Sequence, residues 1–165
     1  ILVRAIALVP SRCRIELTLV GDGVRRAEIE ALAAELGIEN RVVFAPFMEQ
    51  DRLWALLRDA DVLCHAADYE GLGKIIVESM SIGLPPLVSD VEPLNSYITD
   101  GESGFLTENT PEAWAARIVY LHDNPAVLAR AAEGAWRHAS VAFDPERNVE
   151  VYEEAFRTLL KNKGA

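Results

Sequence analysis

The chain has 165 residues, of which 50% are hydrophobic, and it carries a formal net charge of −10. This length fits a single domain with a sizeable core, and the charge argues against a nucleic-acid partner, which needs a basic surface. No apolar run reaches the roughly 20 residues of a membrane-spanning helix, so we expect no membrane span.

The two cysteines, Cys13 and Cys64, lack the spacing of a metal or redox motif. No secretory signal is visible, so we expect a cytoplasmic protein in which both cysteines are reduced and pack as small hydrophobes. The sequence starts at Ile1, without an initiator methionine, inside a helical pattern. We therefore expect residues 1–165 to form one domain of a longer chain.

Short apolar strands alternate with amphipathic helices along the sequence. This alternation predicts an α/β fold with a doubly wound parallel sheet of Rossmann type and a helical C-terminus. Asp123 and Asp144 are expected to cap the last two helices. The strands are expected at residues 15–20, 41–45, 61–65, 86–90 and 105–107. The helices are expected at residues 1–9, 24–36, 51–59, 75–82, 94–98, 111–121, 125–138 and 145–160.

The helix at residues 75–82 carries an acidic residue among apolar ones. Ile76, Met80 and Ile82 leave little polar surface near Glu78, which predicts that the helix is buried. A carboxylate there must be hydrogen-bonded, paired or protonated, because an unpaired buried charge costs several kcal/mol. Glu78 is therefore either a ligand-binding residue or a structural one that bonds a neighbouring N–H group or an arginine.

A Glu-Gly-Leu-Gly-Lys turn at residues 70–74 precedes this helix. Backbone N–H groups at a glycine-rich helix N-terminus favour a phosphate, and Lys74 opposes the helix dipole unless it meets an anion. The simpler interpretation is a tight strand-to-helix turn with an exposed lysine and with Glu70 on the surface. Together, Glu70 and Glu78 would suit a ligand with a diphosphate and two sets of hydroxyls, such as a nucleotide ribose and an attached hexose.

Ligands of doubly wound sheets bind outside the carboxyl ends of the strands. Residues 21–23, 46–50 and 66–74 follow such ends, so we expect these three segments to line one crevice. Plainer interpretations are also open. Residues 21–23 could be only a turn before a helix, and Phe47 could be a core residue rather than a wall for a base. His65 could be a packing residue rather than a ligand contact. The expected donor-binding residues are Gly21, Gly23, Phe47, Met48, Glu49, His65, Glu70, Gly71, Leu72, Gly73, Lys74 and Glu78.

Other site classes fit less well. No Ser/His/Asp order, metal-ligand cluster or P-loop is recognisable. Glu70 and Glu78 could be the two carboxylates of a glycoside hydrolase, but one on a glycine turn and one in a helix suit ligand holding better. A phospho-relay receiver shares the sheet type, yet its acidic cluster and its lysine after the last strand are not recognisable.

Glu70-Gly71-Leu72-Gly73 followed by Glu78 resembles the E-G-F-G…E motif of the glycosyltransferase group 1 family, also called family 4. These are retaining nucleotide-sugar transferases with two Rossmann domains, the GT-B architecture. The resemblance covers nearly the whole chain, in the family's order. It extends to residues 20–23, 42–44, 60–62, 83–85, 88–90 and 100–106.

The resemblance implies the C-terminal, donor-binding domain of a retaining hexosyltransferase. Glu70 would be the catalytic residue at the transferred sugar, residues 71–74 would hold the sugar and the diphosphate, Glu78 the ribose, and residues 47–50 would border the base. Members of the family need no metal. The implied partners are a nucleotide-diphosphate sugar and an N-terminal acceptor-binding domain, and the full enzyme can be peripheral to a membrane.

The family's first strand of this domain, with a basic clamp for the diphosphate, would precede Ile1. Without it, the strands at 15–20 and 61–65 must either pair directly or leave a gap, and we expect the isolated chain to be inactive. The alternative from another class is a non-catalytic nucleotide-binding or interaction module.

Overall fold

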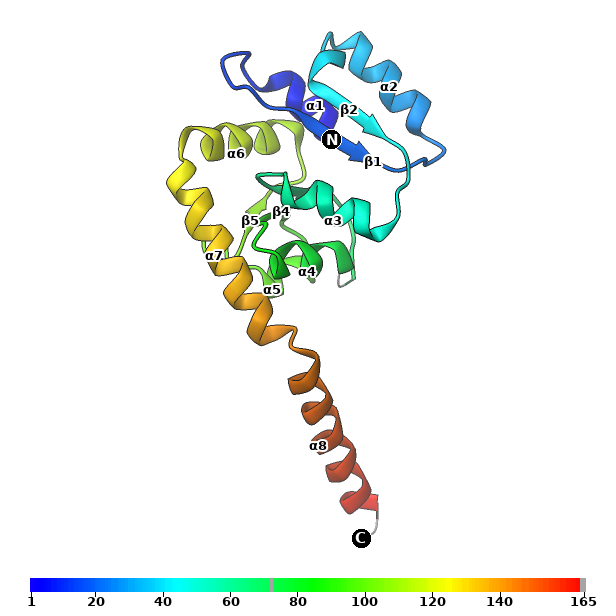
Figure 1. Cartoon of the computed structure of the whole chain (residues 1–165), viewed down its shortest axis with the longest axis vertical. Coiled ribbons are helices and arrows are strands. Elements are labelled where there is room, and N and C mark those ends of the chain that lie inside the picture. The colour runs from blue at the N-terminus through cyan, green and yellow to red at the C-terminus, as the bar shows by residue number, and fades with distance from the viewer. Residues whose placement is uncertain (72, 164–165) are drawn as a thin grey trace.

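The computed structural model describes residues 1–71 and 73–163 as an α/β body from which one long C-terminal helix projects (Figure 1). The strands are β1 (Leu17–Val20), β2 (Val42–Ala45), β3 (Leu63–His65), β4 (Pro86–Ser89) and β5 (Phe105–Thr107). The helices are α1 (Leu2–Leu8), α2 (Arg26–Glu35), the short η1 (Glu39–Arg41), α3 (Gln50–Arg58), α4 (Lys74–Ser81), α5 (Leu94–Tyr97), α6 (Pro111–Asp123), α7 (Pro125–Ala142) and α8 (Pro145–Lys163).

Each expected strand and helix is present, with some ends displaced. Asp144 caps α8 as predicted, because its Oδ1 accepts the N–H of Glu146 at 2.9 Å. The prediction for Asp123 is wrong: it is the last residue of α6, and Asn124 occupies the cap position of α7. α6 instead begins with a side-chain cap from Thr110, whose Oγ1 accepts the N–H of Ala113 at 3.2 Å.

The strands form two parallel sheets, β1–β2 and β3–β4–β5. Leu17 pairs with Val42 in the first sheet, and Leu63 pairs with Pro86 in the second. Within the described residues no ladder joins β1 to β3, so the strands at 15–20 and 61–65 leave a gap rather than pair. The expectation of parallel α/β architecture is confirmed, and the open question about these two strands is answered.

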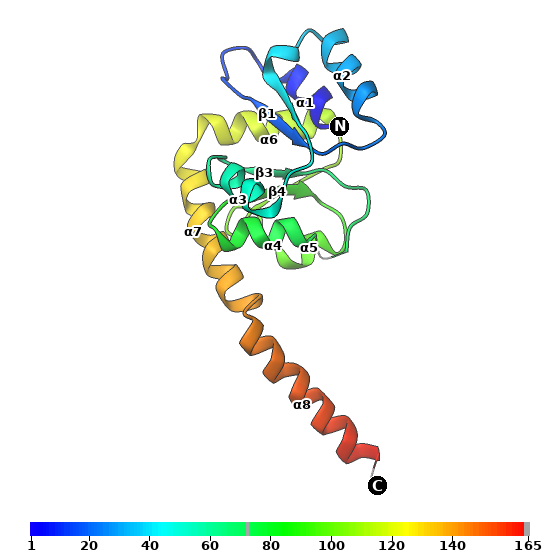
Figure 2. The ribbon, with the colours of Figure 1, turned by 45° about the vertical axis from the view of Figure 1, so that its right-hand side comes forward.

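The faces of β4 belong to two different cores, as the period of two along a strand requires. Leu87 packs with Trp114 of α6 in a cluster that also takes in β1, β2 and α1. Val88 packs with Ile76 of α4 in a second cluster that includes α5 and α7. Figure 2 accordingly shows α6 and α4 on opposite sides of the β3–β5 sheet.

Trp114 is fully buried, whereas Trp136 on α7 is 55% exposed. Cys13 is buried and both cysteines are free, and burial raises the pKa of the Cys64 thiol to about 12. None of the helices in the described part of the chain is long and apolar enough to span a bilayer.

Candidate functional site

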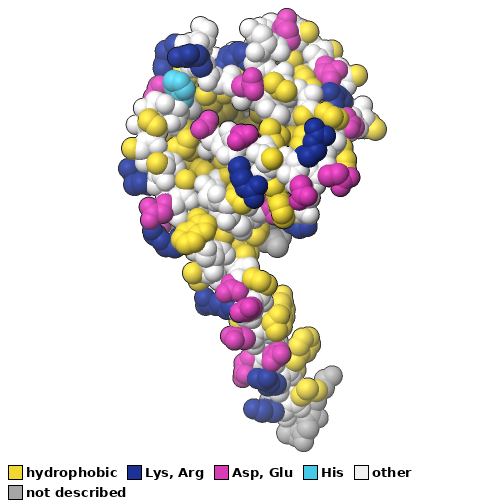
Figure 3. Space-filling model, in the orientation of Figure 1, with side chains coloured by type: hydrophobic (Ala, Val, Ile, Leu, Met, Phe, Trp, Pro, Cys, Tyr) yellow, Lys and Arg dark blue, Asp and Glu magenta, His cyan; other side chains and the backbone are white. Residues whose placement is uncertain are grey.

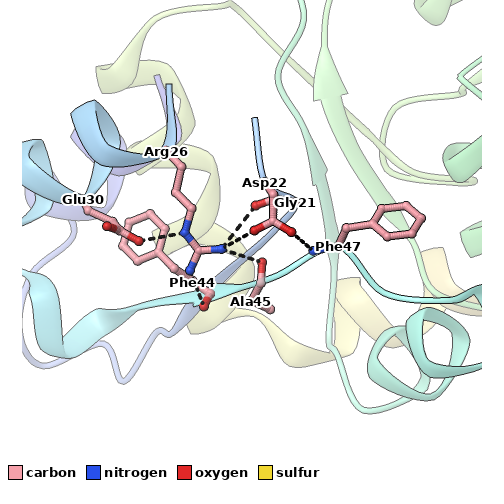
Figure 4. A network of polar contacts seen from close by, with 7 residues as sticks. All are labelled: Gly21, Asp22, Arg26, Glu30, Phe44, Ala45 and Phe47. Carbon is pink, nitrogen blue, oxygen red and sulfur yellow. Dashed lines mark hydrogen bonds and ion pairs between the residues drawn. The ribbon is translucent and has the colours of Figure 1, made fainter. Parts of the chain in front are cut away.

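The loops after β1 and β2 are held together at one edge of their sheet (Figure 4). Gly21 donates its N–H to the carbonyl of Ala45 at 3.0 Å, and Phe47 donates its N–H to Asp22 Oδ2 at 2.7 Å. Arg26, in the first turn of α2, contacts both segments: it forms an ion pair of 2.8 Å with Asp22 Oδ1 and donates to the carbonyl of Ala45 at 3.4 Å. The glycine turn and the expected base-binding loop therefore lie side by side.

Phe47 is not a core residue. Its side chain is 72% exposed, and its ring points away from the Arg26 network (Figure 4). Met48 is half-buried and Glu49 is exposed at the start of α3. The core interpretation of Phe47 is thus wrong, and an exposed aromatic ring is present at the loop where a base was expected to bind.

The third segment, residues 66–74, is connected to this edge by Glu78 of the helix that follows it. Gln50, the first residue of α3, places its Nε2 3.4 Å from Glu78 Oε1, and Lys74 Nζ lies 3.6 Å from the same oxygen. The Glu78 side chain is 19% exposed, on a helix whose Ile76 and Met80 are fully buried. The prediction that this carboxylate is paired is confirmed, although Ile82 lies past the helix end and is 37% exposed.

Glu70 contacts two other predicted site residues. Its Oε2 lies 3.0 Å from His65 Nε2, and its Oε1 accepts the N–H of Gly71 at 3.0 Å. Both the His65 and the Glu70 side chains are partly enclosed, at 24% and 32% exposure. The carboxylate is therefore preorganised by its neighbours and is not a free surface group.

The glycine turn ends at the N-terminus of α4, as predicted. Gly73 occupies the N-cap position with φ +50°, a left-handed conformation that favours glycine. A Cβ at Gly71 would meet nothing within 4 Å, so this stretch of backbone is open to a ligand. Lys74 is exposed and its nearest anion is Glu78, while Leu72 lies outside the described residues.

Tyr97 of α5 was not predicted as part of this site. Its hydroxyl donates to the carbonyl of Gly71 at 3.0 Å. Burial raises the pKa of Tyr97, and the negative charge of Glu70 raises it further, so the phenol remains a donor. A tyrosine at this position carries no sequence signal, because the bond spans elements distant in the chain.

A second unpredicted network of hydrogen bonds holds the loop after β3 in place. Asn109 donates its Nδ2 to Asp68 Oδ1 at 2.6 Å and accepts at its Oδ1 from the Ser89 hydroxyl at 2.9 Å. Ser89, fully buried at the end of β4, in turn accepts the N–H of Ala67 at 3.0 Å. In the sequence, the position of Ser89 at the end of a strand was the one feature that could have indicated this network.

One group of potential metal ligands lies away from these loops. Cys13, His122 and Asp123 bring a sulfur, an imidazole nitrogen and a carboxylate oxygen within 4.8 Å of one another, among the residues searched. However, Arg12 donates to both oxygens of Asp123 at 2.9 Å. The carboxylate already has a cationic partner, which makes it a poor ligand for a metal ion.

A groove of about 580 Å³ also lies elsewhere, between α7 and the loop before β5. Thr99, Glu102, Arg130 and Arg137 are among the residues that line it, and none of the predicted site residues that the structure describes does so. The candidate site is therefore the open edge formed by the ends of β1, β2 and β3 and the N-terminus of α4.

Comparisons with known proteins identify the kind of protein to which this edge belongs. A D-inositol 3-phosphate glycosyltransferase of Acidothermus cellulolyticus is 36% identical over 158 residues, which are 92% of this chain and 35% of that protein. The corresponding enzyme of Thermomonospora curvata is 37% identical over 144 residues, 84% of this chain and 33% of the relative. The chain thus spans about a third of the length of these curated relatives.

Comparison with solved structures agrees with the sequence comparisons. HepE of Anabaena in complex with UDP superposes with a TM-score of 0.81 at 28% identity, covering 97% of this chain and 44% of HepE. The catalytic domain of the Helicobacter pylori cholesterol-alpha-glucosyltransferase gives a TM-score of 0.74 at 26% identity, with 84% of this chain and 86% of that one covered. The sequence model described as glycosyl transferases group 1 matches residues 1–138, so the chain belongs to this family, with the GT-B fold.

Proposed function

We propose that this chain binds the nucleotide-diphosphate sugar of a retaining hexosyltransferase. The observation that carries the proposal is the placement of two partly enclosed carboxylates: Glu70 begins the open glycine turn, and Glu78 lies in α4, the helix that starts at this turn. Backbone N–H groups and the positive end of the helix dipole favour a diphosphate between them. Carboxylates accept hydrogen bonds from hydroxyls, so one suits the hexose and the other the ribose.

The ion pairs at this site can exchange partners when a donor binds. Lys74 is 85% exposed and lies 3.6 Å from Glu78, a loose pair that contributes little in water. In our proposal, Lys74 turns to the diphosphate while Glu78 accepts the ribose hydroxyls. In the same way, Glu70 exchanges its contact with His65 for hydrogen bonds from the hydroxyls of the transferred sugar. The Phe47–Glu49 loop borders the base.

HepE supports a uridine nucleotide, because its complexes contain UDP and UDP-glucose at 28% identity to this chain. The curated relatives act on D-inositol 3-phosphate, and the Helicobacter enzyme on cholesterol. We propose a glycan, inositol phosphate or lipid acceptor, bound by a second domain such as the rest of the relatives' length could form. The reaction proposed uses no metal: α4 and Lys74 supply part of the charge that stabilises the leaving diphosphate, and basic side chains outside these 165 residues supply the rest.

Calorimetric titration of UDP-, GDP- and ADP-hexoses against the wild-type chain and Glu78→Gln tests the ribose role. Glu78→Gln should weaken binding of the preferred donor by about 1–3 kcal/mol, because a charged hydrogen-bond acceptor is lost. Glu154→Gln on α8, an exposed carboxylate remote from the site, is the matched control and should bind as wild type. Thermal melting of each variant checks that the fold is intact.

Unchanged affinity in folded Glu78→Gln would contradict the ribose role. Equal affinity for UDP and UDP-glucose would count against a contact between Glu70 and the sugar, and would favour a non-catalytic nucleotide-binding module.

A further inference from the structure

Two charged residues join the loops after β1 and β2, and neither was among the predicted donor-binding residues. Asp22 uses both of its carboxylate oxygens: Oδ1 pairs with Arg26 at 2.8 Å, and Oδ2 accepts the N–H of Phe47 at 2.7 Å (Figure 4). A hydrogen bond to an ionised acceptor is stronger than one between neutral groups. The Asp22 carboxylate therefore fixes the backbone at Phe47, in the loop that the proposed function assigns to the base.

Arg26 is itself held in place by the ends of both strands. Its Nη2 donates to the carbonyl of Phe44 at 3.2 Å, and its Nη1 lies 3.4 Å from the carbonyls of Gly21 and Ala45. A guanidinium presents its donors in a rigid fork, so these contacts fix its orientation. Asp22 therefore pairs with a cation whose position is set by the ends of β1 and β2.

A neighbouring ion pair shows what an ordinary surface pair is in this helix. Arg25 and Glu28 lie 2.8 Å apart, and their side chains are 72% and 65% exposed. Such a pair contributes little in water. The Arg26 side chain is only 30% exposed, and its pair with Asp22 is bonded to the backbone of both loops. The Asp22–Arg26 pair is therefore built to fix the loops relative to each other.

The bond to Asp22 also determines where an acceptor of the base loop points. The N–H of Phe47 and the carbonyl of Pro46 belong to one planar trans peptide, in which the two groups point in opposite directions. Because the N–H points at Asp22, the Pro46 carbonyl points away from it. No backbone N–H in the part of the chain that the structure describes donates to this carbonyl. An acceptor is thus available next to Phe47, whose ring is exposed.

The preference for one base has to come from contacts to the base. Charge does not select between UDP and ADP, because both carry the same diphosphate, and acidic and basic side chains are mixed over the face seen in Figure 3. Stacking on an aromatic ring tolerates every base. A carbonyl in a fixed direction, in contrast, favours a base with an N–H group in its ring. Uracil has this group at N3, whereas N1 of adenine is an acceptor.

We propose that Asp22 and Arg26 are positioning residues of the base loop and give the chain a preference for UDP over ADP. Asp22 holds the N–H of Phe47 and thereby directs the Pro46 carbonyl to the N3–H group of uracil. Arg26 keeps the Asp22 carboxylate in place. This inference rests on the proposed function and concerns the base alone, since the sugar, the ribose and the diphosphate are assigned to other residues.

Titration of the isotope-labelled chain with UDP and with ADP, followed by NMR, tests the inference. The wild-type chain should bind UDP more tightly than ADP. Asp22→Asn should lower the ratio of the two affinities, because an amide has one acceptor oxygen and cannot serve both Phe47 and Arg26. Arg26→Gln should lower the ratio as well. The expected change is about threefold to tenfold, the equivalent of one hydrogen bond.

The neighbouring pair provides the matched controls. Arg25→Gln and Glu28→Gln change the charge by the same amounts on the same helix, at a pair that is exposed, and both should keep the wild-type ratio. Amide hydrogen exchange of the free chain gives a readout that needs no nucleotide. The N–H of Phe47 should exchange faster in Asp22→Asn and in Arg26→Gln than in the wild type or the controls. Thermal melting checks that each variant is folded.

An unchanged ratio of UDP to ADP affinity in the folded variants overturns the inference, as does a wild-type chain that prefers ADP. Equal weakening of both nucleotides also overturns it, because that pattern would assign the pair to stability alone. A wild-type chain that binds neither nucleotide would overturn the proposed function and the base preference with it. Exchange of the Phe47 amide separates the two cases, since it reports whether Asp22 fixes the loop whatever the chain binds.

Discussion

Asp123 illustrates how a single exposed side chain fixes a loop. Arg12 donates to both carboxylate oxygens at 2.9 Å, and His122 Nδ1 lies 2.9 Å from Oδ1. The hydrogen bonds from Arg12, then those from His122, hold the pKa of Asp123 well below its usual range. These contacts join the loop before β1 to the end of α6, 111 residues away in the sequence.

The Arg12–Asp123 pair predicts a pH dependence of stability. The pKa of Asp123 is lower in the folded state than the value of about 3.9 expected in the unfolded state. The carboxylate therefore stabilises the fold above that value, and the contribution is lost as the pH falls through the folded-state pKa. Arg12→Gln should be less stable than wild type at neutral pH, by a small amount because the pair is exposed.

Urea unfolding of both proteins between neutral and acidic pH measures this. The difference in free energy of unfolding should shrink as the pH drops below about 4. Arg14→Gln, a change at another exposed arginine of the same loop, provides the control. A difference for Arg12→Gln that does not vary with pH would contradict the role of Asp123 ionisation.

Among the elements, α7 depends on a glycine at its contact with the loop before β5. A Cβ on Gly134 would lie 2.0 Å from the carbonyl oxygen and 2.9 Å from the carbonyl carbon of Glu102. Both are backbone atoms, so a side chain cannot be accommodated by a change of rotamer. Glycine at this position therefore lets the helix and the loop pack at close range.

Gly134→Ala should destabilise the protein by about 1–3 kcal/mol, because the loop must move to relieve the overlap. This sign is informative, since the same substitution in a free helix stabilises by about 0.5–1 kcal/mol. Urea unfolding provides the measurement, with Gly23→Ala as control, where a Cβ meets nothing within 4 Å. If Gly134→Ala is more stable than wild type, the loop moves without a loss of stability, and the prediction is wrong.

The elements were predictable where local spacing determines them. The apolar spacing around Ile76 and Met80 correctly predicted the buried face of α4, and the glycine turn correctly predicted where that helix starts. The cap of α7 was misplaced by one residue, since Asp and Asn are equally good caps.

The candidate site was predictable only in part, for a related reason. Strand ends and the Glu70–Glu78 spacing located its main groups. The bonds of Tyr97 to Gly71 and of Asn109 to Asp68 link residues 26 and 41 positions apart. Such bonds depend on the tertiary arrangement, and nothing in the local pattern distinguishes these polar residues from solvated ones.

At the scale of the whole molecule, one core spans two sheets. Leu17 and Val42 of the first sheet share a hydrophobic cluster with Leu87 and Phe105 of the second, although no ladder connects the sheets within the described residues. Apolar packing therefore holds the two halves together across the gap. The alternation of strands and helices predicted parallel sheets, but the neighbours of each strand depend on packing between distant segments.

The candidate site is an open edge of this molecule, which limits what the chain alone can do. In our proposal its carboxylates and glycine backbone hold a donor, but Lys74 and His65 are each shared with a glutamate and the chain bears a net charge of −10. Stabilising a departing diphosphate requires preorganised positive charge and exclusion of water. The open edge provides little of either.

We therefore expect the 165-residue chain to bind a nucleotide sugar without transferring the hexose. Release of UDP from UDP-glucose, followed with inositol phosphate and lipid acceptors, should stay at the rate of the protein-free reaction. A full-length relative serves as the positive control for the assay. Turnover that Glu70→Gln abolishes and Glu154→Gln preserves would contradict this expectation, because that pattern would show that the residues described here form a complete active site by themselves.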